Sequence, residues 1–552
     1  MDSPLALIKA LAERQIINYQ AIEFAHFWLG LDTKLTGDEL IVFLALIHFQ
    51  DKGNVALDQD LLDEFLKLSK LKSVIGLTEA IKNSKLVGES GEFKPFIYWE
   101  GLLYFQKDFM QEKGLSSWIL SRLKSTIEFT SEYKSKIDAV YAADLDNPQK
   151  KAIYWSFYKP IQIITGGPGT GKTFTIGEII KAHKNVFGDS YSIKIAAPTG
   201  KAAQRINDAL TANEDDAIKG VTIHQLLGAT DLLRSFKYNS KNLLVTDLLI
   251  IDEASMMDLS LWSALKNAMS ETTRLIIVGD PFQLSSVESG SVLSDLYSLL
   301  NNIDLNIDEL ASVIHLLEKR HRFTGESGIS KFADAINSMD SEKAFELLKS
   351  NEFSDLKWLE ISADSITKVL NEYAIEPSLS NDLNHLYNYQ IFTALRNGKM
   401  SCNLLNKIVE QELKKIHLIP QSTIWFNQRR VMATKNNYQL GIQNGEIGLY
   451  DEITDKIFFS SENKVSKNLL SDYESGYCIT IHKSQGSEYD HVAIILPDNE
   501  NSILSKELLY TAVTRAKKSV LVVGSSQILK KSISNKTKRK TGLVRHLNNM
   551  LK

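Results

Sequence analysis

The chain has 552 residues, of which 43% are hydrophobic and 24% are charged. This length allows about two to four domains with separate apolar cores, and the composition excludes a disordered or collagen-like chain. The 63 Lys and Arg and the 67 Asp and Glu give a net charge of −4, which excludes a uniformly basic, histone-like protein. Nucleic acid stays open as a partner, because such binding depends on local patches of charge.

Cysteine usage and apolar runs predict the compartment. Cys402 and Cys478 are the only cysteines, too few for a disulfide framework or a Cys-rich metal site. The N-terminal segment has an acidic second residue and further charges that interrupt its apolar run, unlike a secretory signal. The apolar runs are far shorter than the ~20 residues that span a bilayer. We therefore expect a soluble, cytoplasmic protein without a membrane partner.

The first 140 residues are predicted to form a mainly helical module, and they contain no chemical motif. Apolar residues recur at helical spacing from Leu5 to Phe27. The segment Phe96–Phe105 predicts two short strands around Glu100-Gly101. This module either caps the domain that follows or docks a partner subunit.

From about residue 147, short apolar strands alternate with helical segments, which is typical of a parallel sheet in an α/β fold. A second series of such strands lies near the C-terminal end, so we expect two parallel sheets. The expected strands are Ile161–Thr165, Ser192–Ala197, Leu248–Ile251 and Leu275–Val278, followed by Tyr477–Ile481, Val492–Leu496 and Val520–Val523.

The strongest chemical signal is a glycine-rich loop between the first of these strands and a predicted helix, Phe174–His183. It has the pattern G-x-x-x-x-G-K-[ST]. The backbone N–H groups of such a loop and the dipole of the following helix bind phosphate oxygens. Its lysine would reach the β- and γ-phosphates of ATP, and its last hydroxyl would bind Mg²⁺. The loop residues are Gly166, Gly167, Pro168, Gly169, Thr170, Gly171, Lys172 and Thr173.

Two further strands end in polar residues that suit ATP hydrolysis. Asp252 follows Leu248–Ile251 and suits Mg²⁺ coordination, and Glu253 beside it suits a general base that activates water. Gln283 follows the strand Leu275–Val278. Because the carboxyl ends of parallel strands share one edge of a sheet, we expect Gln283 to face the γ-phosphate.

The ordered set of motifs resembles the superfamily 1 helicases over about residues 147–524. Motifs V and VI, written TIHKSQGSEYD and YTAVTRAK here, are similar to the RecD family within that superfamily. The resembling segments are residues 196–203 (motif Ia), 221–228 (Ib), 252–255 (II), 279–283 (III), 317–323 (IV), 480–490 (V) and 509–516 (VI).

The resemblance implies two RecA-like domains with ATP bound between them. Gln149 would read the adenine and Glu488 would help to bind the nucleotide. Arg322 and Arg515 would be arginine fingers on the γ-phosphate, acting with Lys172, Glu253 and Gln283. The cofactors implied are ATP and Mg²⁺, the latter held by Thr173 and Asp252. The residues implied to contact the DNA strand are Pro198, Thr199, Thr222, His224, Thr480, His482 and Lys483.

The expected domains follow from these positions. Residues 229–246 form a short hairpin, either a strand-separation pin or an ordinary loop. Residues 515–552 carry eleven Lys and Arg and no Asp or Glu, and their end is interpreted as a solvated or disordered tail, with a phosphate or partner contact as the alternative. The domain ranges are 1–140 (partner docking), 141–320 (first RecA-like domain) and 321–552 (second RecA-like domain, with an SH3-like insertion at about 427–476 and the basic tail at 530–552).

The family resemblance also implies a function. RecD-family proteins are alpha subunits of exodeoxyribonuclease V, and the chain would be a 5′→3′ DNA helicase that works with RecB-like beta and RecC-like gamma subunits in the bacterial cytosol. The complex would unwind and degrade double-stranded DNA ends in recombinational break repair. Polarity rests on the resemblance alone. The alternatives are a stand-alone RecD-like helicase and a non-catalytic nucleotide-binding scaffold. Any nuclease activity is assigned to a partner.

Overall fold

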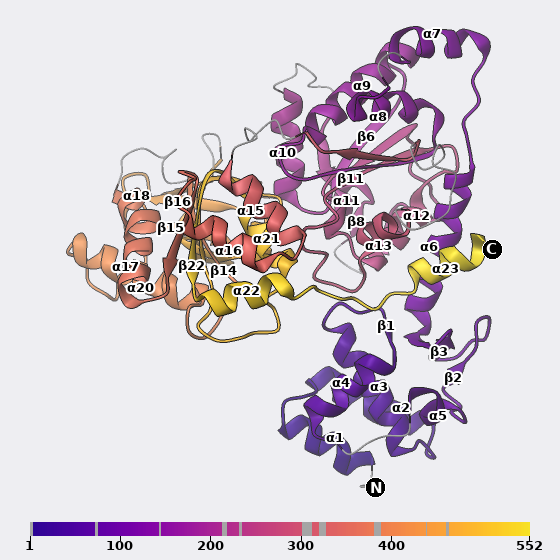
Figure 1. The fold of residues 1–552 in the computed structure, drawn as a ribbon, viewed down its shortest axis with the longest axis horizontal. Coiled ribbons are helices and arrows are strands. Elements are labelled where there is room, and N and C mark those ends of the chain that lie inside the picture. Colours follow the sequence, from indigo (N-terminus) through magenta and orange to yellow (C-terminus); the bar gives the residue numbers. More distant parts are fainter. Residues whose placement is uncertain are drawn as a thin grey trace.

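The computed structural model describes residues 4–71, 76–142, 145–211, 218–230, 235–300, 312–319, 327–379, 388–437, 439–459 and 463–551. Figure 1 shows two α/β bodies side by side and a smaller, mostly helical body that holds the N-terminus. The C-terminal helix returns from the second α/β body to lie against α6 (Gln106–Lys124). Within the described ranges, no helix combines the length and the apolar character needed to cross a membrane.

The N-terminal body is mainly helical, as predicted, and also holds a four-stranded sheet in the order β1-β4-β3-β2. The predicted hairpin is confirmed, because β3 (Phe96–Trp99) and β4 (Leu102–Phe105) pair antiparallel. Glu100 and Gly101 between them have φ values of 47° and 78°, the left-handed conformation that a two-residue hairpin turn requires. The other elements are α1 (Pro4–Glu13), α2 (Tyr19–Leu31), α3 (Gly37–Gln50), β1 (Ala56–Leu57), α4 (Gln59–Ser69), α5 (Leu77–Ile81) and β2 (Val87–Gly88). Helix α7 (Ser131–Tyr141) lies away from this body and packs on α8 (Pro148–Tyr158) and α9 (Lys172–Phe187) of the first lobe.

The first lobe, residues 145–319 where described, is built on a six-stranded parallel sheet in the order β12-β5-β11-β10-β6-β7. Its four predicted strands are confirmed to within one residue at each end. The strands are β5 (Ile161–Gly166), β6 (Ile193–Ala197), β7 (Gly220–Thr222), β10 (Leu248–Ile251), β11 (Arg274–Gly279) and β12 (Ile314–Leu317). The helices are α8 (Pro148–Tyr158), α9 (Lys172–Phe187), α10 (Gly200–Thr211), α11 (Ile223–Leu226), α12 (Leu259–Ala268) and α13 (Val292–Leu300).

Helices cover both faces of this sheet, which explains why its central strands are continuous apolar runs. Successive residues of β5 enter different cores. Ile163 packs in the cluster that contains residues of α6 and α12, whereas Ile164 packs with Ile176 and Ile179 of α9. Side chains along the strand alternate between these two cores, so both faces of the sheet are covered. The carboxyl ends of the strands remain as the edge at which a ligand can bind.

The second lobe, residues 327–535 where described, is built on a five-stranded parallel sheet in the order β13-β22-β21-β14-β20. The three predicted late strands are confirmed, with β22 longer than predicted. The strands are β13 (Leu356–Glu360), β14 (Tyr389–Thr393), β20 (Cys478–Thr480), β21 (Tyr489–Ile495) and β22 (Ala516–Gly524). The helices are α15 (Gly328–Asn337), α16 (Ser341–Lys349), α17 (Ala363–Leu370), α18 (Glu376–Leu379), α20 (Cys402–Ile416), α21 (Lys506–Val513) and α22 (Ser526–Ser534).

Both small insertions contain strands at the expected places. A five-stranded antiparallel sheet, in the order β18-β17-β16-β15-β19, fills the expected insertion in the second lobe. Its SH3-like character stays a prediction. In the first lobe β8 (Ala229–Thr230) and β9 (Ser235–Phe236) pair antiparallel, and their role as a pin also stays a prediction. The strands of the larger insertion are β15 (Arg430–Ala433), β16 (Ile447–Asp451), β17 (Lys456–Phe458), β18 (Lys464–Ser466) and β19 (Tyr473–Ser475).

The interpretation of residues 530–552 as a solvated or disordered tail was wrong. The segment continues α22, crosses from the second lobe and ends in α23 (Leu543–Leu551), which packs on α6. Leu543 and Leu547 are fully buried there. The prediction rested on the number of basic residues. It overlooked the apolar residues between them, which recur at the spacing of an amphipathic helix. The predicted domain ranges otherwise stay predictions.

Candidate functional site

The glycine-rich loop joins β5 to α9 at the carboxyl edge of the first sheet. Gly169 and Gly171 have φ values of 74° and 87°, which L side chains rarely adopt. Gly166 has no room for a side chain, because a Cβ there would lie 2.6 Å from the Leu317 carbonyl oxygen. Glycine therefore permits the tight turn that aims backbone N–H groups at an anion at the start of α9.

The Lys172 ammonium lies within this loop. Its Nζ donates to the carbonyl oxygens of Gly166 and Gly167, at 2.6 and 2.9 Å. Burial lowers the pKa of Lys172, and the carboxylates of Asp280, Glu253 and Asp252 oppose that shift. A polyphosphate in the loop would add negative charge beside the ammonium and favour its charged form.

Asp252 and Glu253 follow β10 at the same edge. The Glu253 backbone has a φ of 51°, uncommon for a residue other than glycine, and its N–H donates to Asp252 Oδ1 at 2.8 Å. Burial raises the pKa of Asp252, and the adjacent Glu253 charge raises it further. The turn thus holds two carboxylates side by side, as the sequence predicted.

A cavity of about 330 Å³ opens between the two lobes at this point. It brings together predicted residues from motifs that are more than 300 positions apart along the chain. The residues that line it are Pro168, Gly169, Gly171, Lys172, Thr173, Phe174, Arg205, Asp252, Glu253, Gln283, Glu488 and Arg515.

Arg515 reaches across the lobes to Gln283. Its Nη2 donates to Gln283 Oε1 at 2.6 Å, and its Nε donates to the Thr511 carbonyl oxygen at 3.2 Å. The side chain is only 2% exposed. The predicted finger and the predicted γ-phosphate sensor are therefore in direct contact, with the finger held rigidly by its own helix.

Three more hydrogen bonds join the same loop of the first lobe to the second lobe. The Tyr510 hydroxyl donates to Asp280 Oδ2 at 3.0 Å, and the Leu284 N–H donates to Thr511 Oγ1 at 2.9 Å. Gln485 Nε2 donates to the Leu284 carbonyl oxygen at 3.0 Å. The cleft is closed in this structure, because these hydrogen bonds join the two lobes through the loop after β11.

Sequence reasoning missed Arg205, which lies on α10. Its guanidinium pairs with Glu253 of the first lobe (Nη1 to Oε1, 3.5 Å) and with Glu488 of the second lobe (Nη2 to Oε1, 2.8 Å). Glu488, assigned to the nucleotide from sequence, does line the cavity, but it does so as one arm of this bridge.

The cavity suits Mg²⁺ with ATP. The Thr173 hydroxyl and the Asp252 carboxylate both line it and supply the hard oxygen ligands that Mg²⁺ prefers. Among the described residues, no group of three or more His, Cys, Asp and Glu side chains forms a separate metal centre. This chain would therefore hold the ion with one or two side chains and leave the other positions to phosphate oxygens and water.

The predicted strand-contacting residues lie at strand ends on both lobes. Pro198 and Thr222 follow or end the paired strands β6 and β7, and Thr222 caps α11. His224 is exposed, with its ring 6.0 Å from the Phe236 ring.

The second-lobe members of this group lie at the end of β20. Thr480 ends that strand, and His482 and the half-buried Lys483 lie in the turn Ile481–Ser484 that follows. The Lys483 ammonium pairs with Glu474 at 2.6 Å. Thr199 meets the second lobe, because a Cβ at Gly486 would lie 3.2 Å from its Oγ1.

Of the predicted nucleotide-site residues that the structure describes, Gln149, Gly166, Gly167 and Thr170 do not line the cavity. Gln149 lies at the start of α8, where its Nε2 donates to the Thr170 carbonyl oxygen at 3.5 Å, so it contacts the phosphate loop from outside. Arg322 lies outside the described residues.

Comparisons with known proteins match this arrangement of two lobes. Residues 149–289 match the AAA domain family, and residues 475–523 match the UvrD-like helicase C-terminal domain. RecBCD enzyme subunit RecD of Haemophilus influenzae is 31% identical over 82% of this chain and 81% of that protein. The chain belongs to the RecD family.

More distant relatives share parts of the chain. The ATP-dependent RecD2 DNA helicase of Deinococcus radiodurans is 26% identical over 66% of this chain but only 47% of that protein. The solved structure of Pif1 helicase from Candida albicans aligns with 77% of this chain and 100% of that chain, at 14% identity and a TM-score of 0.40.

In this RecD-family chain the cavity lies where the two matched segments meet. The AAA domain match contains Lys172, Asp252 and Gln283, and the UvrD-like match contains Glu488 and Arg515. Arg205 lies inside the first match but belongs to none of the chemical patterns, because a single arginine in an amphipathic helix has no signature of its own. Only its position, six residues after Thr199 and two residues past the end of motif Ia, could have drawn attention to it.

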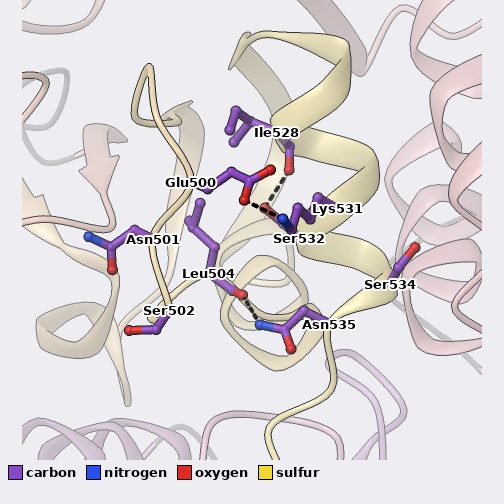
Figure 2. A pocket seen from close by; sticks show the side chains of 9 residues that line it. All are labelled: Glu500, Asn501, Ser502, Leu504, Ile528, Lys531, Ser532, Ser534 and Asn535. Atoms are coloured by element: carbon purple, nitrogen blue, oxygen red, sulfur yellow. Dashed lines mark hydrogen bonds and ion pairs between the residues drawn. The ribbon is translucent and has the colours of Figure 1, made fainter. Parts of the chain in front are cut away.

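A larger cavity, of about 600 Å³, lies elsewhere on the second lobe (Figure 2). It opens between the segment Glu500–Leu504 and α22, and Figure 2 shows Lys531 paired with Glu500 and Asn535 bonded to the Leu504 carbonyl oxygen. It contains no glycine-rich loop and none of the motif residues. Size alone therefore does not identify the nucleotide site of this RecD-family chain, whereas the smaller cavity holds the chemistry.

Proposed function

We propose that the chain is an ATP-dependent 5′→3′ DNA helicase and the RecD-type subunit of a RecBCD-like complex. It would work with RecB-like and RecC-like subunits on double-stranded DNA ends in recombinational break repair. The observation that carries the proposal is the cavity in which Lys172, Asp252 and Gln283 of the first lobe face Arg515 of the second.

The first lobe would bind the nucleotide. Loop N–H groups and Lys172 would hold the β- and γ-phosphates, and Thr173 and Asp252 would hold Mg²⁺, which supplies charge neutralisation when bound. Glu253 would accept a proton from water as the water oxygen bonds to the γ-phosphorus and the bond to ADP breaks. Gln283 would orient that water or sense the phosphate.

Arg515 would stabilise the charge that spreads over the γ-phosphoryl oxygens in the transition state. Its buried position and its hydrogen bond to Gln283 support this role. By resemblance Arg322 would do the same from the segment after β12. Gln149, at the edge of the phosphate loop, would contact the adenine.

Hydrolysis would be converted to movement through the contacts between the lobes. The bonds of Arg515, Tyr510 and Gln485 to the loop Asp280–Leu284 hold the cleft closed. Loss of the γ-phosphate removes the ligand that both lobes would share, so the cleft can open and close once per ATP.

A single DNA strand would lie across both lobes, held mainly through its backbone. The residues proposed to contact it are Pro198, Thr199, Thr222, His224, Thr480, His482 and Lys483. The paired strand ends of β6 and β7, the exposed His224 and the turn after β20 support this path.

Two alternatives are less well supported. A stand-alone helicase of the RecD2 type is less well supported because the RecD2 relative matches 66% of this chain at 26% identity, whereas the RecD relative matches 82% of it at 31% identity. A non-catalytic scaffold is disfavoured because the cavity retains its lysine, both carboxylates and its arginine.

A Lys172→Gln variant tests the motor directly. We expect hydrolysis of ATP on single-stranded DNA to fall by about 100-fold or more, because the charge on the β- and γ-phosphates loses its cation. Lys181→Gln, an exposed position later on the same helix α9, is the matched control. A wild-type chain without ATP hydrolysis on single-stranded DNA would overturn the motor and favour the scaffold.

Polarity needs a second experiment. Duplexes with either a 5′ or a 3′ single-stranded tail should be offered to the wild-type chain with ATP. We expect unwinding of the 5′-tailed duplex, and unwinding of the 3′-tailed duplex alone would overturn the polarity. Co-purification from the native cell would identify the beta and gamma partners.

A further inference from the structure

Helix α10 joins two regions of the molecule that have different tasks. It begins at Gly200, directly after Pro198 and Thr199, which are proposed to contact the strand. Its second turn carries Arg205 to the lining of the ATP cavity. One rigid helix of twelve residues therefore touches both the strand path and the hydrolysis site.

The start of α10 also lies against the second lobe. A Cβ at Gly200 would overlap the Gln443 side-chain amide of the β insertion, and a Cβ at Gly486 would lie 3.2 Å from Thr199 Oγ1. The helix end near the strand path is therefore in close contact with segments that move with the second lobe.

Arg205 bridges one carboxylate from each lobe. Its distances to Glu253 and Glu488 are 3.5 and 2.8 Å, and those two side chains are only 11% and 10% exposed. Lys517 is the other cation near Glu488, at 3.9 Å. The two carboxylates are thus largely shielded from solvent, whereas the Arg205 side chain is 36% exposed, so screening weakens these pairs less than it weakens pairs of fully exposed groups.

We propose that Arg205 is a positioning residue that makes water activation by Glu253 depend on strand binding and lobe closure. The proposal rests on the proposed helicase function and deepens it. Glu253 stands on a left-handed backbone turn, and Arg205 is the guanidinium that fixes where its carboxylate points. Glu488 belongs to the other lobe, so opening of the cleft would withdraw it from Arg205 and closure would complete the bridge.

The chemistry explains why this position carries an arginine. A guanidinium presents several N–H groups in one plane and can hold two carboxylates at once, whereas an ammonium is a single point of charge. Arg205→Lys should therefore keep the charge but lose the bridge, and Glu488→Gln should weaken the same bridge from the other lobe.

The test compares Arg205→Gln, Arg205→Lys and Glu488→Gln with Gln204→Ala, an exposed position on the same helix. We expect the Arg205 variants to lose about 30-fold in kcat for ATP on single-stranded DNA, with KM for ATP within about threefold. Hydrolysis without DNA should change much less, so the stimulation by DNA falls. Gln204→Ala should behave as wild type.

A binding measurement provides a readout that does not depend on turnover. Coupling between two ligands is reciprocal, so in the wild-type chain an ATP analogue should change the affinity for a fluorescent single-stranded oligonucleotide. This change should shrink by about tenfold in Arg205→Gln and Glu488→Gln. The double variant should be no worse than Arg205→Gln, because both remove the same bridge.

The outcomes separate the two levels of the argument. A wild-type chain without DNA-stimulated hydrolysis counts against the helicase proposal itself. A stimulated wild-type chain whose Arg205 variants keep both the stimulation and the nucleotide effect on DNA affinity overturns the role of Arg205. Equal losses of hydrolysis with and without DNA would also overturn it, and if Arg205→Gln fails to fold, Glu488→Gln decides the question.

Discussion

At the scale of single residues, the 2.6 Å hydrogen bond between Arg515 and Gln283 links the two lobes at the ATP cavity. Arg515 is 2% exposed and makes its other bonds to its own lobe, with Thr511 and Ser487. A side chain held this firmly is pre-organised for a charge that develops only in the transition state. Substitution of Arg515 should therefore lower kcat for ATP hydrolysis and have little effect on ATP binding.

Arg515→Gln should lower kcat for ATP by about 1000-fold or more, with KM changed only a few-fold, since a cis arginine acts on transition-state charge. Steady-state hydrolysis on single-stranded DNA measures both constants. Arg515→Lys keeps a cation but lacks the planar donor group, so its kcat should lie between those of the wild type and Arg515→Gln. A glutamine variant that retains a tenth of the wild-type kcat would contradict the finger role.

The sequence could predict only those site residues that belong to a recognisable motif. Lys172, Asp252 and Gln283 each follow a strand or a glycine-rich loop, and the ordering of parallel strands places them at one edge. Arg205 could not be found this way, since its role depends on which carboxylates the fold brings to it. Glu488 lines the cavity, its nucleotide-binding role stays a prediction, and its bridge to Arg205 is a tertiary contact that no spacing encodes.

At the scale of elements, the hydrophobic periodicity and the polar residues that flank each run predicted the strands well, but they predicted tertiary contacts poorly. The buried strand Leu248–Ile251 was predicted at its observed bounds, because an aspartate flanks it on each side. Strand β22 begins at Ala516, four residues before the predicted start, since Ala516 and Ser519 pair with Tyr489 and His491 of β21. Lys517 and Lys518 lie between these pairs at a break in register and stay exposed, so their polarity does not end the strand.

Helix α2 of the N-terminal body carries an apolar ridge on its exposed side. Tyr19, Phe27 and Leu31 recur at multiples of four and are 76%, 59% and 52% exposed, with the exposed Glu23 between the first two on the same row. Apolar ridges of this size on a helix are typical of protein contact surfaces. This ridge is our proposed docking face for a partner subunit.

Replacing Tyr19, Phe27 and Leu31 by Ser should reduce co-purification of the partner subunits by about tenfold or more, because aromatic anchors dominate such interfaces. DNA-stimulated ATP hydrolysis by the isolated chain should stay unchanged, since the ridge lies on the N-terminal body and the ATP cavity lies between the two lobes. Leu418→Ser, which is 92% exposed on the second lobe, is the matched control. Full retention of the partners would show that docking uses another face.

At the scale of the whole molecule, the C-terminal segment 535–551 acts as a strap across all three bodies. Arg539 donates to the backbone carbonyl oxygens of Glu288 and Gly290, just after the loop that joins the lobes. The Lys540 carbonyl oxygen accepts from the Val55 and Ala56 N–H groups of the N-terminal body, at 2.9 and 3.1 Å. The strap thus ties the motor to the domain proposed to dock partners.

Basic composition suggested the opposite of this outcome, because charge runs are usually solvated. Here the charges have fixed partners: Arg539 has backbone carbonyls, and Lys540 has Asp58 and Asp60. Gly542 fits under the Tyr104 hydroxyl, where a Cβ would lie 1.9 Å from that oxygen. Such long-range fits are a property of the assembled molecule and leave no local pattern in the sequence.

One carboxyl group beneath the strap makes its stability depend on pH. Asp295 of α13 accepts hydrogen bonds from Thr541 Oγ1 at 2.8 Å and Ser291 Oγ at 3.0 Å. Burial raises the pKa of Asp295 to about 6, against the lowering effect of these bonds and of Arg539. Because the folded pKa lies above the unfolded one, the fold favours the protonated carboxyl. Its contribution is full below pH ~4 and is lost as the pH rises through about 6.

Asp295→Asn should remove this dependence, because the amide stays neutral at every pH. Between pH 4.5 and pH 8 the variant should lose less unfolding free energy than the wild type, by on the order of 2 kcal/mol. Chemical unfolding of both chains at the two pH values measures the difference. Asp108 contributes equally to both chains, whereas the variant also lacks the Asp295 charge that helps to raise the pKa of Glu112, which changes the pH dependence in the same direction. Asp189→Asn, at an exposed position, should give a curve parallel to wild type. A curve for Asp295→Asn that is also parallel to wild type would mean that ionisation of this carboxyl does not oppose docking of the strap.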